Sequence, residues 1–157
     1  MLALAVAALL FWGERTPPIY AQGPPAQPPT QQPPAAPPQV FGSDVALVLN
    51  FIKADRTADF EAVIARLKEA LQKSERPERK QQAVGWRVFK AAEPGPAGTA
   101  IYLFVIDPPL KGANYSVAAL LAEGFPAQAE VYQQDFAGTL AQGQTLINLK
   151  LMSVLRK

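Results

Sequence analysis

Val45-Ala-Leu-Val-Leu-Asn-Phe-Ile52 decides the fold, because this stretch is apolar on both sides of an extended chain. It is rich in β-branched and aromatic residues, which is typical of a strand in the interior of a sheet. One amide, Asn50, interrupts it. The stretch therefore predicts a central strand with a single buried polar side chain that needs hydrogen-bond partners.

A helix is predicted directly after this strand. Thr57 is a suitable N-cap, and Asp59 and Glu61 lie near the positive end of the helix dipole. An apolar stripe with helical spacing then continues to about Ser74, and it consists of Phe60, Val63, Ile64, Leu67 and Leu71. Pro77 prevents further continuation, so the helix ends before it.

Three more strand-like runs follow. Residues 82–90 and 99–107 are separated by a loop rich in proline and glycine, which predicts a hairpin. Residues 145–152 form the last strand, and Asn114 and Pro126 are placed to begin two short helices before it.

The order strand, helix, strand, strand, helices, strand predicts an α+β fold of the ferredoxin-like, split βαβ kind. Such a fold has a four-stranded antiparallel sheet in the order 4-1-3-2, with helices on one face. The first and third strands are then central. They are also the two runs that are apolar on both sides.

Alternation along the strands assigns side chains to the two faces of the sheet. The aliphatic sets, such as Leu47 and Leu49 or Ile101 and Leu103, are expected to face the helices. The uncovered face would then hold Val48, Asn50, Ile52, Tyr102, Phe104, Asn148 and Lys150. Soluble monomers seldom expose so large an apolar patch. The sequence thus predicts a homodimer packed through this face, with a small apolar ligand or an envelope protein as possible further partners.

Residues 44–152 resemble the ferredoxin-like domain of the dimeric α+β barrel superfamily. Several strings are also similar to uncharacterised exported bacterial proteins: Ile106-Asp-Pro-Pro109, Gly112-Ala-Asn-Tyr-Ser116, Glu123-Gly-Phe-Pro126 and Gly143-Gln-Thr-Leu-Ile-Asn-Leu149. The resemblance rests on element order and these strings, and it includes no catalytic motif.

This resemblance implies a second possible function, that of a cofactor-independent monooxygenase or isomerase of the dimeric α+β barrel type, because some members of the superfamily are cofactor-independent monooxygenases. Those enzymes place an Asn on the first strand and Trp, Tyr or Arg inside the barrel, which points to Asn50, Trp86, Arg87 and Tyr102. Alternation puts Trp86 and Arg87 on opposite faces, so only one of them can join Asn50. Haem-degrading members also use a His, and this chain has none.

The candidate ligand-binding residues are therefore Asn50, Tyr102, Phe104, Asn148, Lys150 and Trp86, and no catalytic residue is assigned. Asn50 keeps two interpretations. It is either a structural amide that pairs with Asn148 or with its counterpart in a second copy, or a ligand-binding group. Lys150 is either a solvated strand end or an anion-binding group.

The composition excludes several kinds of chemistry. The chain has 157 residues with no cysteine and no histidine, so thiolate sites, disulfides and Ser-His catalysis are not expected. No metal or cofactor is predicted. The net charge of +2 gives no basis for nucleic-acid binding.

Three segments divide the chain. Residues 1–21 contain an apolar run, Met1 to Trp12, which is too short to span a bilayer and matches a signal-peptide core. Residues 22–40 are expected to be a disordered Pro/Gln/Ala-rich spacer, and 41–157 are expected to form the domain. An uncleaved anchor or a chance apolar terminus remains an alternative. The sequence predicts an exported bacterial domain, periplasmic or secreted, that acts as a dimerising binding or structural module.

Overall fold

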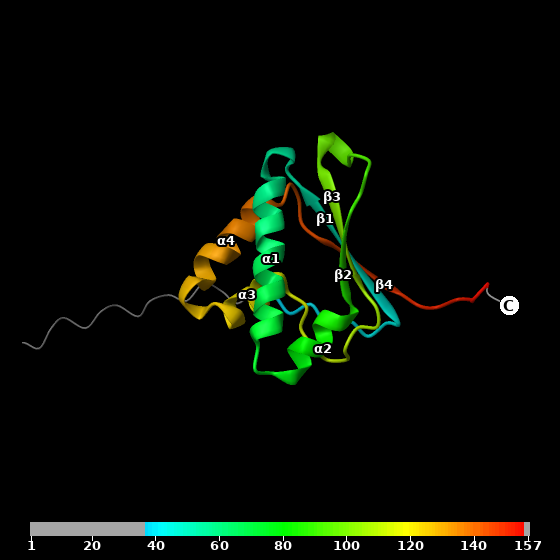
Figure 1. The fold of residues 1–157 in the computed structure, drawn as a ribbon. Helices are drawn as coiled ribbons and strands as arrows, with labels where there is room; N and C mark the ends of the chain where they lie inside the picture. Colours follow the sequence, from blue (N-terminus) through cyan, green and yellow to red (C-terminus); the bar gives the residue numbers. More distant parts are fainter. Residues whose placement is uncertain (1–36, 156–157) are drawn as a thin grey trace, which may run out of the picture. The chain divides into compact units, whose positions relative to one another are not determined.

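The computed structural model describes residues 37–155, which form a mixed α+β domain (Figure 1). Its strands are β1 (Val45–Ile52), β2 (Trp86–Lys90), β3 (Ala100–Ile106) and β4 (Thr145–Leu149). Its α-helices are α1 (Thr57–Lys73), α2 (Pro77–Gly85), α3 (Val117–Gly124) and α4 (Ala129–Thr139). The predicted leader and most of the predicted spacer lie outside the described residues.

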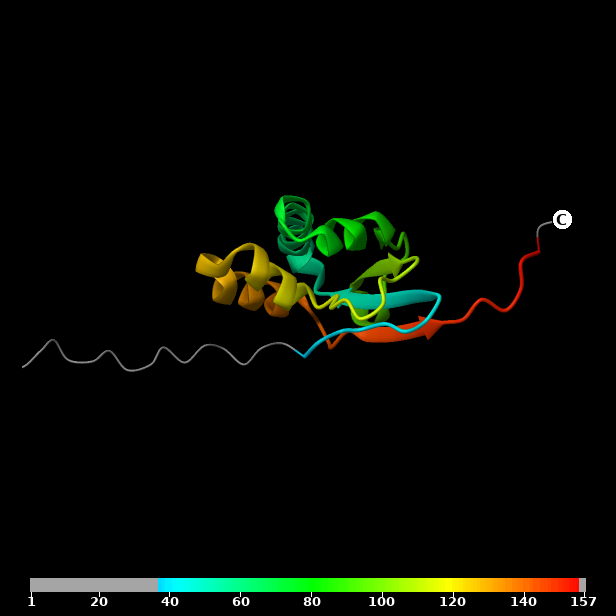
Figure 2. The same cartoon turned by 90° about the horizontal axis from the view of Figure 1, so that it is seen from below.

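The four strands form one antiparallel sheet in the order β2-β3-β1-β4, which confirms the predicted order. β1 and β3 occupy its centre, with Leu49 opposite Leu103 and Asn50 opposite Tyr102. The view from below shows the helices gathered on one side of the sheet (Figure 2). The other side carries no helix of the described chain.

The prediction of which face the helices cover was wrong. Val48, Asn50 and Ile52 of β1 lie beneath the helices and are at most 1% exposed, as are Phe104 and Ile106 of β3. The aliphatic residues predicted to face the helices line the uncovered side instead. Aromatic rings explain this choice, because they fill the space between α1 and the sheet better than short aliphatic chains.

Phe60 of α1 is at the centre of that packing. Its ring lies 4.7 Å from the ring of Tyr102 and 6.2 Å from that of Phe104, measured between centroids. Phe136 of α4 contacts it from a third side at 6.3 Å. One helical aromatic thus joins β3, α1 and α4 into a single core.

The region before β2 also differs from the prediction, because residues 82–85 are helical and the strand begins only at Trp86. Pro77 stands in the first turn of α2. Proline is favoured there because its φ suits a helix and the first-turn N–H needs no partner. Pro77 therefore ends α1 and also starts a second helix.

The remaining boundaries shift by a few residues. β4 ends at Leu149 rather than at 152, because its partner strand β1 begins at Val45, the residue that pairs with Leu149. No side-chain hydrogen bond caps α1 or α3, and the amide oxygen of Asn114 accepts from the backbone N–H of Ser116, the residue before α3. Gln39 already belongs to the domain, since its backbone binds Asn114 and Tyr115.

Candidate functional site

The uncovered side of the sheet is the most prominent surface of the domain, and we call it the open face. It carries the alternate side chains of all four strands, which are Arg87, Phe89, Leu47, Leu49, Phe51, Ile101, Leu103, Val105, Thr145, Ile147 and Leu149. Phe89 is 50% exposed, and Ile147 and Leu149 are 36% and 38% exposed. The open face is therefore apolar and accessible to solvent in the described chain.

Polar groups occur only at the margins of this face. Arg87 lies on the edge strand and forms an ion pair with Asp107 at 3.3 Å, with both side chains about half exposed. Thr145 lies at the start of the opposite edge strand. An apolar centre with a polar rim is the arrangement that protein–protein interfaces share.

Asn50 lies on the other side of the sheet, where it is fully buried. Its Oδ1 accepts a hydrogen bond from Gln144 Nε2 at 2.6 Å, and its Nδ2 donates to the backbone oxygens of Tyr102 and Val48 at 3.2 and 3.3 Å. Gln144 Oε1 in turn accepts from Gln39 Nε2. The amide of Asn50 is thus fully used inside the protomer, and its partner is Gln144 rather than the predicted Asn148.

A second cluster of polar side chains links α1 to the end of β2 and to β3. The hydroxyl of Tyr102 donates to Glu61 Oε1 at 2.5 Å, and Lys90 Nζ contacts the same oxygen at 3.0 Å. The hydrogen bond from Tyr102 and then that from Lys90 lower the pKa of Glu61. Burial and the hydrogen bond to Glu61 raise the pKa of Tyr102. At neutral pH Glu61 is therefore ionised and its charge is balanced by Lys90.

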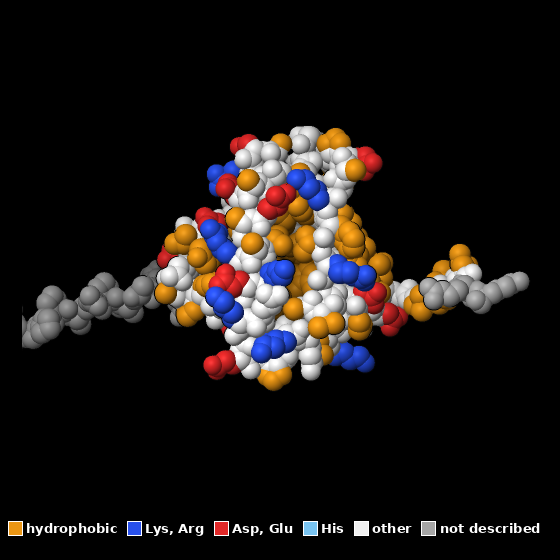
Figure 3. All heavy atoms as spheres, in the orientation of Figure 1, with side chains coloured by type: hydrophobic (Ala, Val, Ile, Leu, Met, Phe, Trp, Pro, Cys, Tyr) orange, Lys and Arg blue, Asp and Glu red, His pale blue; other side chains and the backbone are white. Residues whose placement is uncertain are grey.

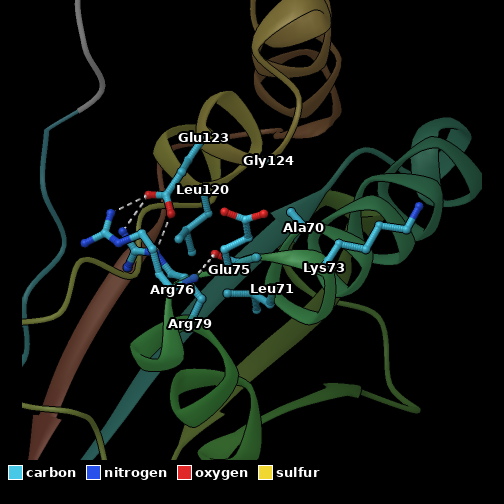
Figure 4. A pocket seen from close by; sticks show the side chains of 10 residues that line it. Ala70, Leu71, Lys73, Glu75, Arg76, Arg79, Leu120, Glu123 and Gly124 are labelled. Carbon is cyan, nitrogen blue, oxygen red and sulfur yellow. Dashed lines mark hydrogen bonds and ion pairs between the residues drawn. The ribbon is translucent and has the colours of Figure 1, made fainter.

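A third cluster joins the α1–α2 turn to α3 (Figure 4). The guanidinium of Arg79 is bidentate to Glu123, with N–O distances of 2.9 and 2.6 Å, and Arg76 adds a contact at 3.1 Å. The Arg79 side chain is only 8% exposed. Its hydrogen bonds lower the pKa of Glu123 and raise that of Arg79.

These ions border a hollow of about 270 Å³. Arg79 also donates to Gln82 at 2.6 Å, and Gln82 donates to the backbone of Asn114. Every charged group at the centre of the cluster has its partner within the domain. The cluster therefore fastens helices together, and its two arginines are already bound to the carboxylate of Glu123.

The structure does not bring the predicted site residues together. Tyr102 and Phe104 lie in the core beside Phe60, and Trp86 packs edge-on against Phe104 with the rings 5.5 Å apart. Asn148 accepts a hydrogen bond from Ser43 at the exposed edge, and Lys150 follows the end of β4. Trp86 and Arg87 lie on opposite faces, as predicted.

Sequence reasoning missed Gln144 and the Arg79–Glu123 pair. Gln144 precedes β4, and its position directly across from Asn50 follows only from the β1–β4 register. Arg79 lies in a run of charged residues, which is typical of a solvent-exposed surface. A signal for Gln144 was nevertheless present, because a buried amide such as Asn50 requires a polar partner on a neighbouring strand.

Within residues 37–155, no three His, Cys, Asp or Glu residues gather in a way that could hold a metal ion. Nor does this part of the chain contain a helix with the length and hydrophobicity needed to cross a membrane. Comparisons with protein-family models, curated proteins and solved structures found no match.

Proposed function

We propose that this chain is an exported, homodimerising module of ferredoxin-like split βαβ topology, in which two copies pack open face against open face. The observation that supports this proposal is the open face itself, an apolar sheet surface that no element of the described chain covers. The antiparallel order β2-β3-β1-β4 supports the topology.

The size of the open face supports a second copy as its occupant. Four strands about 4.8 Å apart and five residues long, at about 3.3 Å per residue, cover roughly 19 by 17 Å. The flat footprint is about 300 Å², and projecting side chains make the accessible area larger. Soluble monomers rarely carry larger continuous apolar patches. Two such footprints together cover about 600 Å², and the projecting side chains bring the buried area toward the roughly 1,000 Å² at which specific interfaces begin.

The geometry of the face also suits self-association. In a two-fold dimer the same patch meets itself, so it must be complementary to its own surface. A nearly uniform aliphatic surface with charge only at its margin meets this condition, because no buried charge has to face its own copy. The central pair Leu49 and Leu103 then lies at the middle of the interface.

The test is the oligomeric state of the full chain by sedimentation or light scattering. We expect a dimer at micromolar concentration, and a monomer for Phe89→Lys and Leu103→Lys. Phe89 is half exposed on an edge strand, so its substitution leaves the protomer folded. Val131→Lys is the matched control, since Val131 is 56% exposed on α4 and away from the sheet. A wild-type monomer at this concentration, or a dimeric Phe89→Lys variant, contradicts the proposal.

Export is supported by the sequence of residues 1–21 and is tested separately. We expect the mature protein to lack this segment and to begin with the proline-rich spacer. Intact-mass measurement of protein recovered from its native cell decides the point. A cytoplasmic chain that retains Met1 contradicts export.

No observation favours the oxygenase alternative. Asn50, its best-motivated residue, has both ends of its amide bonded inside the protomer, and Arg87 lies on the opposite face. We therefore do not propose that activity.

A further inference from the structure

A groove separates α1 from β2 on the helix-covered side of the sheet, opposite to the open face. Figure 3 shows hydrophobic side chains at the bottom of this hollow and charged side chains around it. Its volume is about 320 Å³, at the lower end of the range for small-molecule sites. Six of its eight lining residues are apolar: Ile64, Leu67, Leu71, Ala83, Trp86 and Val88.

The groove is elongated, because its helical wall extends from Ile64 to Gln72. At about 1.5 Å rise per residue this wall is roughly 12 Å long. The strand wall is formed by Trp86 and Val88, which are neighbours on one side of β2. An extended aliphatic chain fits such a shape better than a compact ring system.

The charges around the groove are not balanced. Glu61 and Lys90 pair with each other beside it, so together they contribute no net charge. Lys68 lines the groove, is exposed, and forms no ion pair with any residue that the structure describes. The rim thus carries one unpaired positive charge, with the Gln72 amide one turn away.

Trp86 contributes a second observation. Its Nε1 is the only buried side-chain nitrogen or oxygen in the described residues that has no hydrogen-bond partner. A buried donor without an acceptor costs about 1–3 kcal/mol, so the hydrogen-bonding capacity of this indole is not satisfied within the described residues. This residue stands in the groove wall.

We propose that the groove binds a medium-chain aliphatic carboxylate, with the chain along Ile64, Leu67 and Val88 and the carboxylate at Lys68. The apolar wall selects the chain, and the unpaired ammonium selects the anionic end. The hollow beside Arg79 offers no such free positive charge from this residue, because Glu123 already neutralises its guanidinium. This inference is independent of the proposed dimer, since the two surfaces lie on opposite sides of the sheet.

Titration of the full chain with octanoate tests the proposal, with Trp86 fluorescence as the signal. The chain has two tryptophans, so Trp12→Phe is the background in which Trp86 alone reports. We expect saturable binding. Hexanoate, which is shorter by two methylenes, should bind about fifteenfold more weakly, since each buried methylene contributes about 0.8 kcal/mol.

Two variants separate the apolar and the charged contributions. Lys68→Gln should weaken octanoate about two- to fivefold, the effect of losing one exposed ion pair, and leave octanol unchanged. Val88→Glu should abolish binding of both probes, whereas Val131→Glu, on the distant α4, should bind as the background does. Native mass spectrometry confirms the stoichiometry. No saturable binding of octanoate, or equal binding by Val88→Glu, overturns the proposal.

Phe89→Lys separates this proposal from the dimer. A monomeric Phe89→Lys that still binds octanoate supports the groove as a site within one protomer. A monomeric variant that loses octanoate while remaining folded overturns the placement of the ligand in this groove.

Discussion

The contact between α1 and α3 is predicted to depend on the absence of a side chain at Gly124, the last residue of α3. A Cβ at this position would overlap the Cβ of Ala70 and lie 3.0 Å from its Cα. Ordinary carbon–carbon contacts are about 3.5–4.0 Å, so the two helices must separate by about 1 Å to admit a methyl group. Gly124→Ala should therefore destabilise the domain.

The magnitude follows from two opposing effects. Forcing a methyl group into a packed contact costs about 1–3 kcal/mol. Replacing glycine within a helix returns at most about 1 kcal/mol, and less at the last residue. We expect a net loss of about 2 kcal/mol in the free energy of unfolding, which for a domain of this size lowers Tm by roughly 5–10 °C.

Urea and thermal unfolding of the full chain, followed by circular dichroism, measure this loss. Gly143→Ala is the control, because a Cβ at Gly143 meets no atom within 4 Å, and it should be neutral or stabilising by up to about 1 kcal/mol. The double variant Ala70→Gly/Gly124→Ala moves the methyl group to the other helix. It should be more stable than the sum of the two single changes predicts. Wild-type stability of Gly124→Ala, or strict additivity, refutes this account of the contact.

Three further changes have defined outcomes. Arg79 lowers the pKa of Glu123 in the folded chain, so on acidification the unfolded chain takes up this proton first. The stability from Glu123 is complete above its ordinary pKa of about 4.3 and is lost as pH falls below that value, and urea unfolding should show a weaker acid dependence for Glu123→Gln. Asn50→Ala leaves Gln144 Nε2 without its acceptor and removes the side-chain donor to the Tyr102 and Val48 carbonyls, and it should cost about 1–3 kcal/mol, measured by the same unfolding assay. Phe60→Ala should cost about 3–5 kcal/mol, since its ring is fully buried against three others, and a loss below 1 kcal/mol would contradict its central place in the core.

The sheet order could be predicted from the sequence because it depends on few observations. Only β1 and β3 are apolar on both sides, and an antiparallel arrangement places two such strands at the centre. The apolar stripe of α1 from Phe60 to Leu71 was equally informative, since its spacing fits the period of an α-helix and not that of a strand. The start of α2 was missed because a proline after a helix is read as an end, although the same residue suits a first helical turn.

Which side of the sheet the helices cover could not be predicted from the strand sequences. When one side of a strand is polar, alternation assigns the buried side directly. In β1 and β3 both sides are apolar, so alternation defines two sets without ranking them. The decision depends on how Phe60 meets Tyr102 and Phe104. That fit is a property of ring shapes across the interface between helix and sheet, which strand composition does not contain.

Asn50 also has a structural role, because it determines how β1 pairs with β4. A shift of one residue between β1 and β4 would exchange the two faces of β4, and because every residue of this edge strand is exposed the shift costs little hydrophobic burial. The hydrogen bond between the amides of Asn50 and Gln144 sets the register. In the observed register Asn50 stands across from Gln144 and bonds to it at 2.6 Å, whereas a one-residue slip would place Thr145 there and leave the buried amide without its partner. The loss of that hydrogen bond costs about 1–3 kcal/mol, which favours the observed register. A single polar residue in the most apolar strand therefore specifies how β4 pairs with β1, whereas the packing of Phe60 on Tyr102 and Phe104 decides which face remains open.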